Sequence, residues 1–234
     1  MDPVIPCASP QSQTSPHQFS SRPFNHTRFE QELNIATQLG HEAFGEGSRY
    51  SWAQRKEIYR AWIDGHPATF HFICDSDGQE IGYLSVIPMR ETAAGTSHYS
   101  GYTSQFELNQ NHISPENAKT NLVYLQGIFL KPLYRRRDDT TRLLLDTLYQ
   151  RFAAFVHEPE RLIIYAEIYS PLGESFLTKV GFFDSGRRSR DDKMIMELHF
   201  SGFRGARAVA GSERHLQSTM LSVGRLLADN ATPM

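Results

Sequence analysis

The chain has 234 residues, of which 39% are hydrophobic and 21% are charged, and its formal net charge at pH 7 is −2. This composition is typical of one globular domain with a sizeable core, and it gives no reason to expect a nucleic-acid partner or a membrane surface. We find no apolar segment long enough to span a bilayer and no signal-peptide pattern. The two cysteines show no metal-type spacing. We therefore expect a cytoplasmic protein that holds no metal.

Residues 1–26 differ in composition from the rest of the chain. They are rich in Pro, Ser and Gln and contain few apolar residues. Such a segment buries too little surface to offset the entropy that it loses on ordering, so we expect a disordered leader. The leader is either a solvated tail or an export signal, because its composition resembles the Ser/Pro-rich leaders of effectors that bacterial type III systems secrete.

Two helices and a hairpin are expected next. The pattern Thr-Arg-Phe-Glu at 27–30 fits a capping box, and apolar residues follow at helical spacing up to Ala43. A second helix, 51–65, starts with another Ser/Gln box and ends at a glycine. The segments 68–75 and 80–87 are rich in β-branched and aromatic residues and flank an Asp-Gly turn, which predicts a hairpin.

The second half of the domain alternates strands and helices. Residues 89–120 form a long polar loop, which we interpret either as a lid over a substrate or as a simple insertion. Strands and helices then alternate at 121–130, 139–157, 162–169, 171–180 and 193–200. This order predicts an α+β domain over residues 27–200, in which helices flank a central mixed sheet.

One segment of this domain resembles a family signature. Residues Ile128–Leu144 (IFLKPLYRRRDDTTRLL) are similar to the motif of the GNAT (Gcn5-related N-acetyltransferase) superfamily. That motif has a strand ending in Pro, then an Arg, then glycines at the third and fifth positions after it, and a helix with paired leucines. The pair Gly181-Phe182 resembles a second family motif. The resemblance covers about Phe29–Phe200 and implies a GNAT-like fold and an N-acyltransferase that uses acetyl-CoA.

The sequence departs from the family at the turn that cradles phosphate. Asp138 and Thr140 stand where the resemblance expects glycines, which let the backbone N–H groups at a helix start approach a pyrophosphate closely. The carboxylate of Asp138 can cap the helix itself and would repel phosphate. Arginine side chains can bind phosphate instead, or they are simply exposed charges at a solvated helix start. The resemblance thus implies these cofactor-binding residues: Phe129, Leu130, Arg135, Arg136, Arg137, Thr140 and Thr141.

A second departure concerns catalysis. The tyrosine that many family members use to protonate the leaving thiolate corresponds here to Leu177. Strand alternation places Tyr165, Glu167 and Tyr169 on one face of the strand 162–169. The resemblance implies that this strand diverges from the preceding one and that the acyl thioester lies in the gap. Glu167 is then the candidate base, with Tyr165 or Tyr169 as the candidate acid. The other interpretation is a partly exposed glutamate beside core tyrosines.

Residues 201–234 are expected to form a C-terminal extension. Leu216, Met220, Val223 and Leu227 repeat at helical spacing after Ser212, which predicts an amphipathic helix. The apolar stripe of this helix packs on its own domain, forms a homodimer contact or meets another partner.

Three functions are compatible with these patterns. The first is an acyl-CoA-dependent N-acyltransferase, an acetyltransferase in its simplest form, that acts on a small-molecule or protein amine. The second is the same transfer with an acyl carrier protein as donor, because carrier proteins are acidic and the arginine run would suit an acidic surface. The third is a non-catalytic GNAT-like binding or effector protein. No residue pattern identifies the acceptor.

Overall fold

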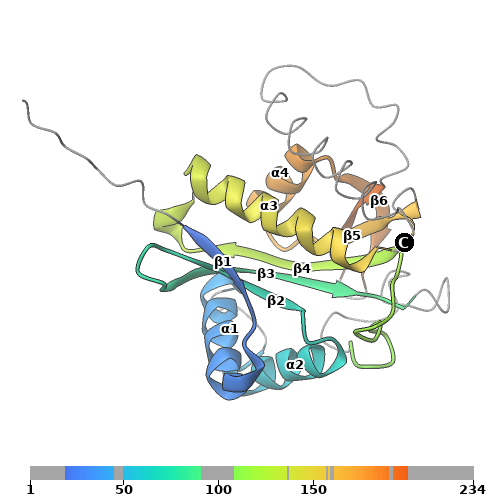
Figure 1. Ribbon diagram of the computed structural model, residues 1–234. Helices are drawn as coiled ribbons and strands as arrows, with labels where there is room; N and C mark the ends of the chain where they lie inside the picture. The colour runs from blue at the N-terminus through green and yellow to red at the C-terminus, as the bar shows by residue number, and fades with distance from the viewer. Residues whose placement is uncertain are drawn as a thin grey trace, which may run out of the picture.

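The computed structural model describes residues 19–44, 50–90, 108–135, 137–156, 158, 161–189 and 192–199. One seven-stranded sheet runs in the order β1-β2-β3-β4-β5-β7-β6 (Figure 1). The strands are β1 Ser20–Pro23, β2 Phe70–Cys74, β3 Glu80–Pro88, β4 Leu122–Leu130, β5 Ile163–Glu167, β6 Phe183–Arg188 and β7 Met194–His199. The α-helices are α1 Phe29–Phe44, α2 Trp52–Gly65, α3 Asp138–Phe155 and α4 Pro171–Val180, and the 3-10 helices are η1 His26–Arg28 and η4 Pro132–Tyr134.

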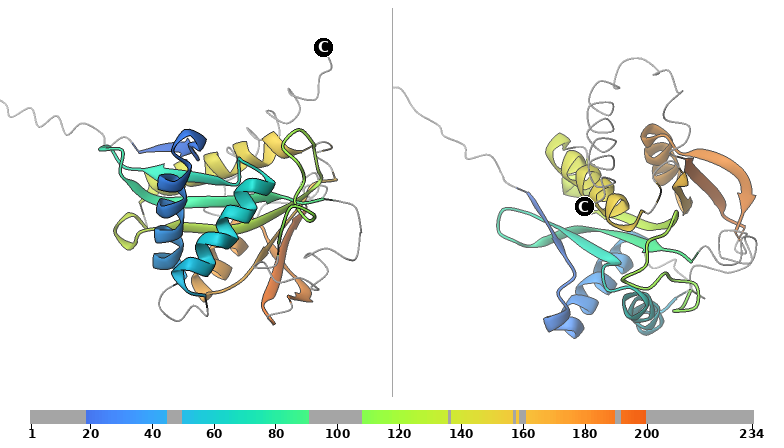
Figure 2. Two further views of the ribbon diagram at one scale, coloured as in Figure 1. Left: turned by 90° about the horizontal axis from the view of Figure 1, so that it is seen from below. Right: turned by 45° about the vertical axis from the view of Figure 1, so that its right-hand side comes forward.

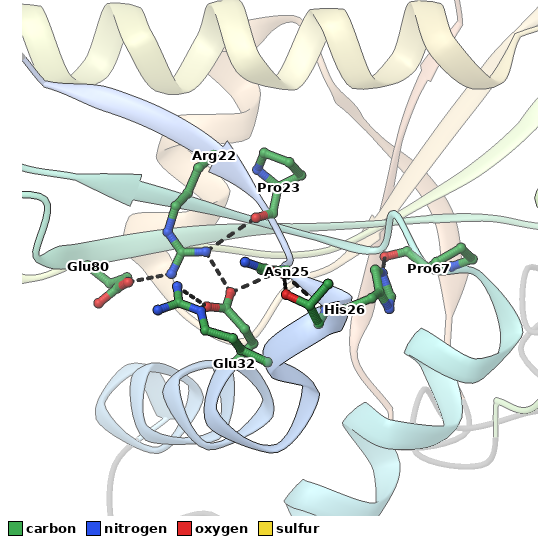
Figure 3. Close-up of polar contacts among 9 residues, drawn as sticks. Arg22, Pro23, Asn25, His26, Glu32, Pro67 and Glu80 are labelled. Carbon is green, nitrogen blue, oxygen red and sulfur yellow. Dashed lines mark hydrogen bonds and ion pairs between the residues drawn. The ribbon is translucent and has the colours of Figure 1, made fainter.

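The first strand lies inside the segment that we expected to be a disordered leader. β1 pairs antiparallel with β2, so over residues 20–26 the structure differs from that expectation. Figure 3 shows the reason. Arg22 Nη1 donates to Glu32 Oε2 (2.6 Å), and Arg22 also bonds Glu80 at the start of β3. Because the Glu32 side chain is completely buried, this ion pair joins β1 firmly to α1.

The helix starts follow local capping rules, with one correction. Ser51 and Gln54 form the expected capping box of α2. The expected box at Thr27 is wrong, because the turn η1 comes first and the side chain of Asn25 accepts from the N–H of Thr27. The expected hairpin is confirmed, and its turn contains Gly78 at a positive φ of 78°, where a side chain would be strained.

The helices cover the two faces of the sheet in pairs. Figures 1 and 2 show α1 and α2 on one face and α3 and α4 on the other. Two apolar clusters correspond to these two layers. β5 divides between them as strand alternation predicted, because Ile164 and Ala166 pack in the α3/α4 layer whereas Tyr165 packs in the α1/α2 layer. The side chain of Glu167 follows that of Tyr165 on the α1/α2 side.

The parallel pair β4 and β5 is short. It extends from Leu122, which faces Ile163, to Tyr124, which faces Tyr165, although β4 continues to Leu130. Beyond Tyr124 the two strands diverge. A register shift against β3 makes Gln126 the extra residue of a β-bulge close to this point. A gap therefore opens in the sheet between the carboxyl ends of β4 and β5.

The last third of the domain adds one unexpected strand. α4 begins after the capping residue Ser170 and ends at Gly181, whose φ is 106°. β6 was not expected, because most of its residues are polar and exposed. The expected extension 201–234 and its amphipathic helix lie outside the described residues. Within the described part of the chain, no helix is long and apolar enough to cross a membrane.

Candidate active site

Two polar side chains make a close contact at the carboxyl end of β5, where β4 and β5 part. Tyr169 lies just beyond the end of β5, and its hydroxyl donates to Glu167 Oε2 at 2.5 Å. Glu167 is 7% exposed and Tyr169 is 37% exposed, so the carboxylate is sheltered while the phenol reaches solvent. The ring of Phe44, the last residue of α1, packs edge-on against Tyr169 with centroids 5.8 Å apart. The pair therefore lies on the α1/α2 side of the gap.

Tyr165 occupies a different environment from Tyr169. Its ring is completely buried and stacks on the ring of Tyr124, with centroids 5.0 Å apart and an interplanar angle of 20°. Burial and, secondarily, the negative charge of Glu167 raise the pKa of Tyr124 well above its usual value. This stack lies where β4 and β5 are still paired. The structure thus brings Glu167 and Tyr169 together and places Tyr165 in the core.

The turn after β4 is built around Arg135. Its Nε donates to the carbonyl of Leu130 (2.7 Å), and its guanidinium lies 5.6 Å from the centroid of the Phe129 ring. Phe129 is buried in the α1/α2 layer, whereas the side chain of Leu130 packs on the opposite layer. Arg135 itself is exposed. Among the described residues no hydrogen-bond partner occupies its terminal guanidinium N–H groups, so they can reach a ligand at the turn.

A carboxylate of the protein occupies the start of α3, but it is not the one that we expected. Asp139 Oδ1 accepts from the backbone N–H of Thr140 (2.9 Å), and Asp139 Oδ2 accepts from Arg137 Nη2 (3.1 Å). Asp138, the expected capping residue, is exposed and makes no capping bond. The hydroxyl of Thr140 is also engaged, because it donates towards the carbonyls of Tyr134 (2.8 Å) and Arg137 (3.0 Å). Thr140 therefore maintains the shape of the turn.

The remaining predicted residues have less defined positions. Thr141 is half-buried, and its backbone N–H donates to the carbonyl of Arg137 (3.0 Å) within the first turn of α3. Arg136 lies outside the described residues. Leu177 is 6% exposed and packs with the α3/α4 layer, so α4 supplies no hydroxyl at this position.

Two residues beside the site could not be predicted from the sequence. Phe44 ends α1 beside Tyr169, and Lys193 Nζ, before β7, lies 5.6 Å from the centroid of the Tyr169 ring. No local pattern could have joined residues so distant in the chain. Among the described residues, no cluster of three His, Cys, Asp or Glu side chains could hold a metal ion. The chemistry available here is that of a carboxylate, a phenol and a nearby ammonium group.

Solved structures resemble this fold over most of the chain. PH1933 from Pyrococcus horikoshii OT3 matches 78% of this chain and 98% of its own, with a TM-score of 0.52 and 12% identity. A GNAT-family acetyltransferase from Staphylococcus aureus Mu50 matches 78% and 99%, with a TM-score of 0.49 and 12% identity. The PaiA N-acetyltransferase from Thermoplasma acidophilum, solved in complex with coenzyme A, matches 78% and 99%, with a TM-score of 0.48 and 16% identity.

Sequence comparison adds no closer relative. No protein-family model and no curated protein matches the sequence. The element order, the mixed sheet and the structural likeness together confirm the expected architecture. The chain thus has the fold that the resemblance in its sequence led us to expect, a mixed sheet flanked by helices.

Proposed function

We propose that the protein is an N-acyltransferase that transfers an acyl group, in the simplest case acetyl, from coenzyme A to an amine. One observation carries this proposal. The sheet opens between β4 and β5 beyond Tyr124, and the sheltered carboxylate of Glu167, bonded to the phenol of Tyr169, lies beside the opening. A gap of this kind accepts a narrow thioester arm, and the pair supplies groups that take up and release protons.

The backbone of β4 favours an extended arm as the donor group. From Leu125 to Leu130 the side of β4 that faces β5 has no strand beside it in the described part of the chain. An extended ligand with amide groups, such as pantetheine, can hydrogen-bond to such a strand in the manner of an added strand. At the far end, Arg135 and Arg137 are close enough to the turn to bind phosphate. Their present bonds at the surface are weak enough for a phosphate to displace them.

The chemistry can be written with every proton balanced. Glu167 accepts a proton from the amine nitrogen as that nitrogen attacks the thioester carbonyl and the C–N bond forms. Tyr169 donates its proton to the sulfur as the C–S bond breaks. The phenolate then regains a proton from Glu167 through their 2.5 Å hydrogen bond. The pair thus moves one proton from the amine to the thiol and returns to its starting state.

Two measurements test the proposal. Calorimetry with acetyl-CoA should show binding by the wild-type protein and by Glu167→Gln, because Glu167 is not a donor-binding group. Release of free thiol in the presence of a panel of amines should fall by about 10²-fold or more in Glu167→Gln. Glu174→Gln, a change at an exposed position on α4, is the matched control and should keep full activity. Unchanged thiol release in Glu167→Gln would refute the proposal and favour a non-catalytic binding protein, and absence of acetyl-CoA binding would refute coenzyme A as the donor.

The occupied start of α3 favours a second donor. Asp139 accepts hydrogen bonds from a backbone N–H and from Arg137, two donors that a diphosphate would otherwise use. A pantetheine arm on an acidic acyl carrier protein has no free nucleotide diphosphate and depends less on this turn. Reversing the charge of Arg135 and Arg137 should then abolish binding of the carrier protein while circular dichroism stays unchanged. Persistent binding would remove this candidate.

A further inference from the structure

A surface hollow lies beside α1, at the end of the sheet where β3 begins and β4 ends. Its volume is about 390 Å³, within the range of small-molecule sites. α1, the start of α2, the β2–β3 turn and Lys131, which directly follows β4, form its wall. The left view of Figure 2 shows α1 beside the turn that follows β4. The described lining residues are Gln31, Asn34, Ile35, Gln38, Leu39, Trp52, Gln79, Glu80 and Lys131.

Carboxamides dominate this lining because of the helical repeat of α1. Gln31, Asn34 and Gln38 recur at helical spacing, so they share one face of the helix. Gln79 approaches from the β2–β3 turn on the opposite side. In the described part of the chain, the side chains of Gln31, Asn34 and Gln79 make no hydrogen bond, and Gln38 uses its Nε2 on Glu42 (2.9 Å) and retains its carbonyl oxygen. The hollow thus offers several donors and several acceptors to a ligand.

The charges around the hollow disfavour an ionic ligand. Glu80 is the carboxylate among the described lining residues, and Arg22 already bonds it. A cationic ligand would therefore find no unpaired carboxylate in this lining. Lys131 is the single cation of the same set, which is too little for a phosphate. The hollow is suited to the neutral, polar part of a ligand.

The ring of Trp52 limits the class of ligand further. Trp52 is 38% exposed at the first position of α2, and it adds a flat apolar surface to a lining that also contains Ile35. Hydroxyl groups both donate and accept, as carboxamides do, so the two complement each other. A pyranose ring combines many hydroxyl groups with an apolar C–H face. We propose that this hollow is a saccharide-binding subsite and that, given the proposed function, the acceptor amine is an amino sugar.

The position of the hollow agrees with an acceptor role. The Trp52 ring packs edge-on against His41 of α1, with centroids 6.2 Å apart, and Phe44 at the end of the same helix contacts Tyr169. Lys131 follows the strand whose open side faces the gap. A ligand in the hollow therefore contacts α1, whose last residue packs on Tyr169, and Lys131 at the end of β4. An amino group on a sugar in this position would enter the gap from the α1/α2 side.

Tryptophan fluorescence tests the subsite without requiring activity. The chain has two tryptophans, and Trp62 is fully buried, so acrylamide quenching reports mainly on Trp52. D-Glucosamine and D-glucose at millimolar concentrations should both reduce quenching in a saturable manner, whereas cadaverine, an amine without hydroxyl groups, should not. The double variant Asn34→Ala/Gln38→Ala should weaken this protection about tenfold or more. Gln150→Ala, on the exposed side of α3, should leave it unchanged.

The outcomes separate this inference from the proposed function. Protection by saccharides without thiol release from acetyl-CoA supports the subsite and overturns the acyltransferase. Thiol release with other amines and no protection by either sugar overturns the subsite and supports the acyltransferase. Equal protection by cadaverine, or protection that survives in the double variant, also overturns the subsite.

Discussion

Replacing His66 by glutamine should reduce the acid sensitivity of the protein. His66 follows α2 and is 2% exposed. Its Nδ1 accepts from the backbone N–H of Ala68 (3.2 Å), and its ring packs edge-on against Phe155 with centroids 5.0 Å apart. Burial, together with the positive charge of Arg151 on α3, lowers the pKa of His66 from 6.5 to about 4. The native state therefore holds this imidazole neutral.

The size of the effect follows from proton linkage. The unfolded chain protonates His66 below pH 6.5, whereas the native state does not until about pH 4. The stability contributed by the neutral ring is therefore present above pH 6.5 and is lost as the pH falls towards 4. A difference between 6.5 and about 4 corresponds to about 3 kcal/mol at most, and we expect about 2 kcal/mol after solvent screening.

Urea unfolding at pH 7 and pH 4.5 measures this loss directly. Glutamine keeps an acceptor for the Ala68 N–H but does not titrate, so the comparison at pH 7 isolates any packing cost of the substitution. Between the two pH values, His66→Gln should lose about 2 kcal/mol less stability than the wild type. Parallel losses in the two proteins would show that the native state does not exclude the proton from His66, and the reasoning would fail.

Four further changes have defined outcomes. Asp139→Asn should strengthen coenzyme A binding several-fold in calorimetry, because it removes the carboxylate from the start of α3. Tyr169→Phe should lower kcat for acyl transfer by about 10²-fold with little change in the KM for donor. Gly82→Ala should cost about 1–3 kcal/mol in urea unfolding, because a Cβ would lie 2.2 Å from the carbonyl oxygen of Phe129. Glu32→Gln should cost about 3–5 kcal/mol in the same assay, because it removes the buried partner of an arginine.

The sequence predicts the architecture well wherever the apolar residues of a helix or strand follow a clear pattern within that element. The apolar strand around Tyr124 and the helix around Leu148 carry enough buried residues to be recognised. β1 and β6 were missed because their residues are mostly polar, and pairing with a neighbouring strand holds them in place. Such strands depend on tertiary contacts that a local pattern does not contain.

The arrangement of the candidate catalytic residues, as distinct from their role, was predicted in part. Strand alternation placed Glu167 and Tyr169 on the same side, and the structure joins them by a hydrogen bond. The same rule also offered Tyr165, since it cannot distinguish a phenol at the opening from one inside the core. The expectation that Asp138 caps α3 was wrong, because the N-cap position is Arg137 and the carboxylate that accepts a backbone N–H there belongs to Asp139. Two adjacent aspartates at a helix start are equivalent in sequence, and the location of Arg137 favours Asp139.

The anchoring of β1 has a consequence for truncated forms of the protein. Phe72 and its neighbours in β2 form an apolar strand. β1 pairs with the edge of β2 that faces away from β3 and so supplies hydrogen-bond partners for the backbone there. A fragment that starts at Thr27, where composition places the domain boundary, would lack β1 and Arg22. The backbone N–H and C=O groups along that edge of β2 would then be free to pair with another molecule. Such a fragment should aggregate during expression, whereas one that starts at residue 19 should remain dispersed.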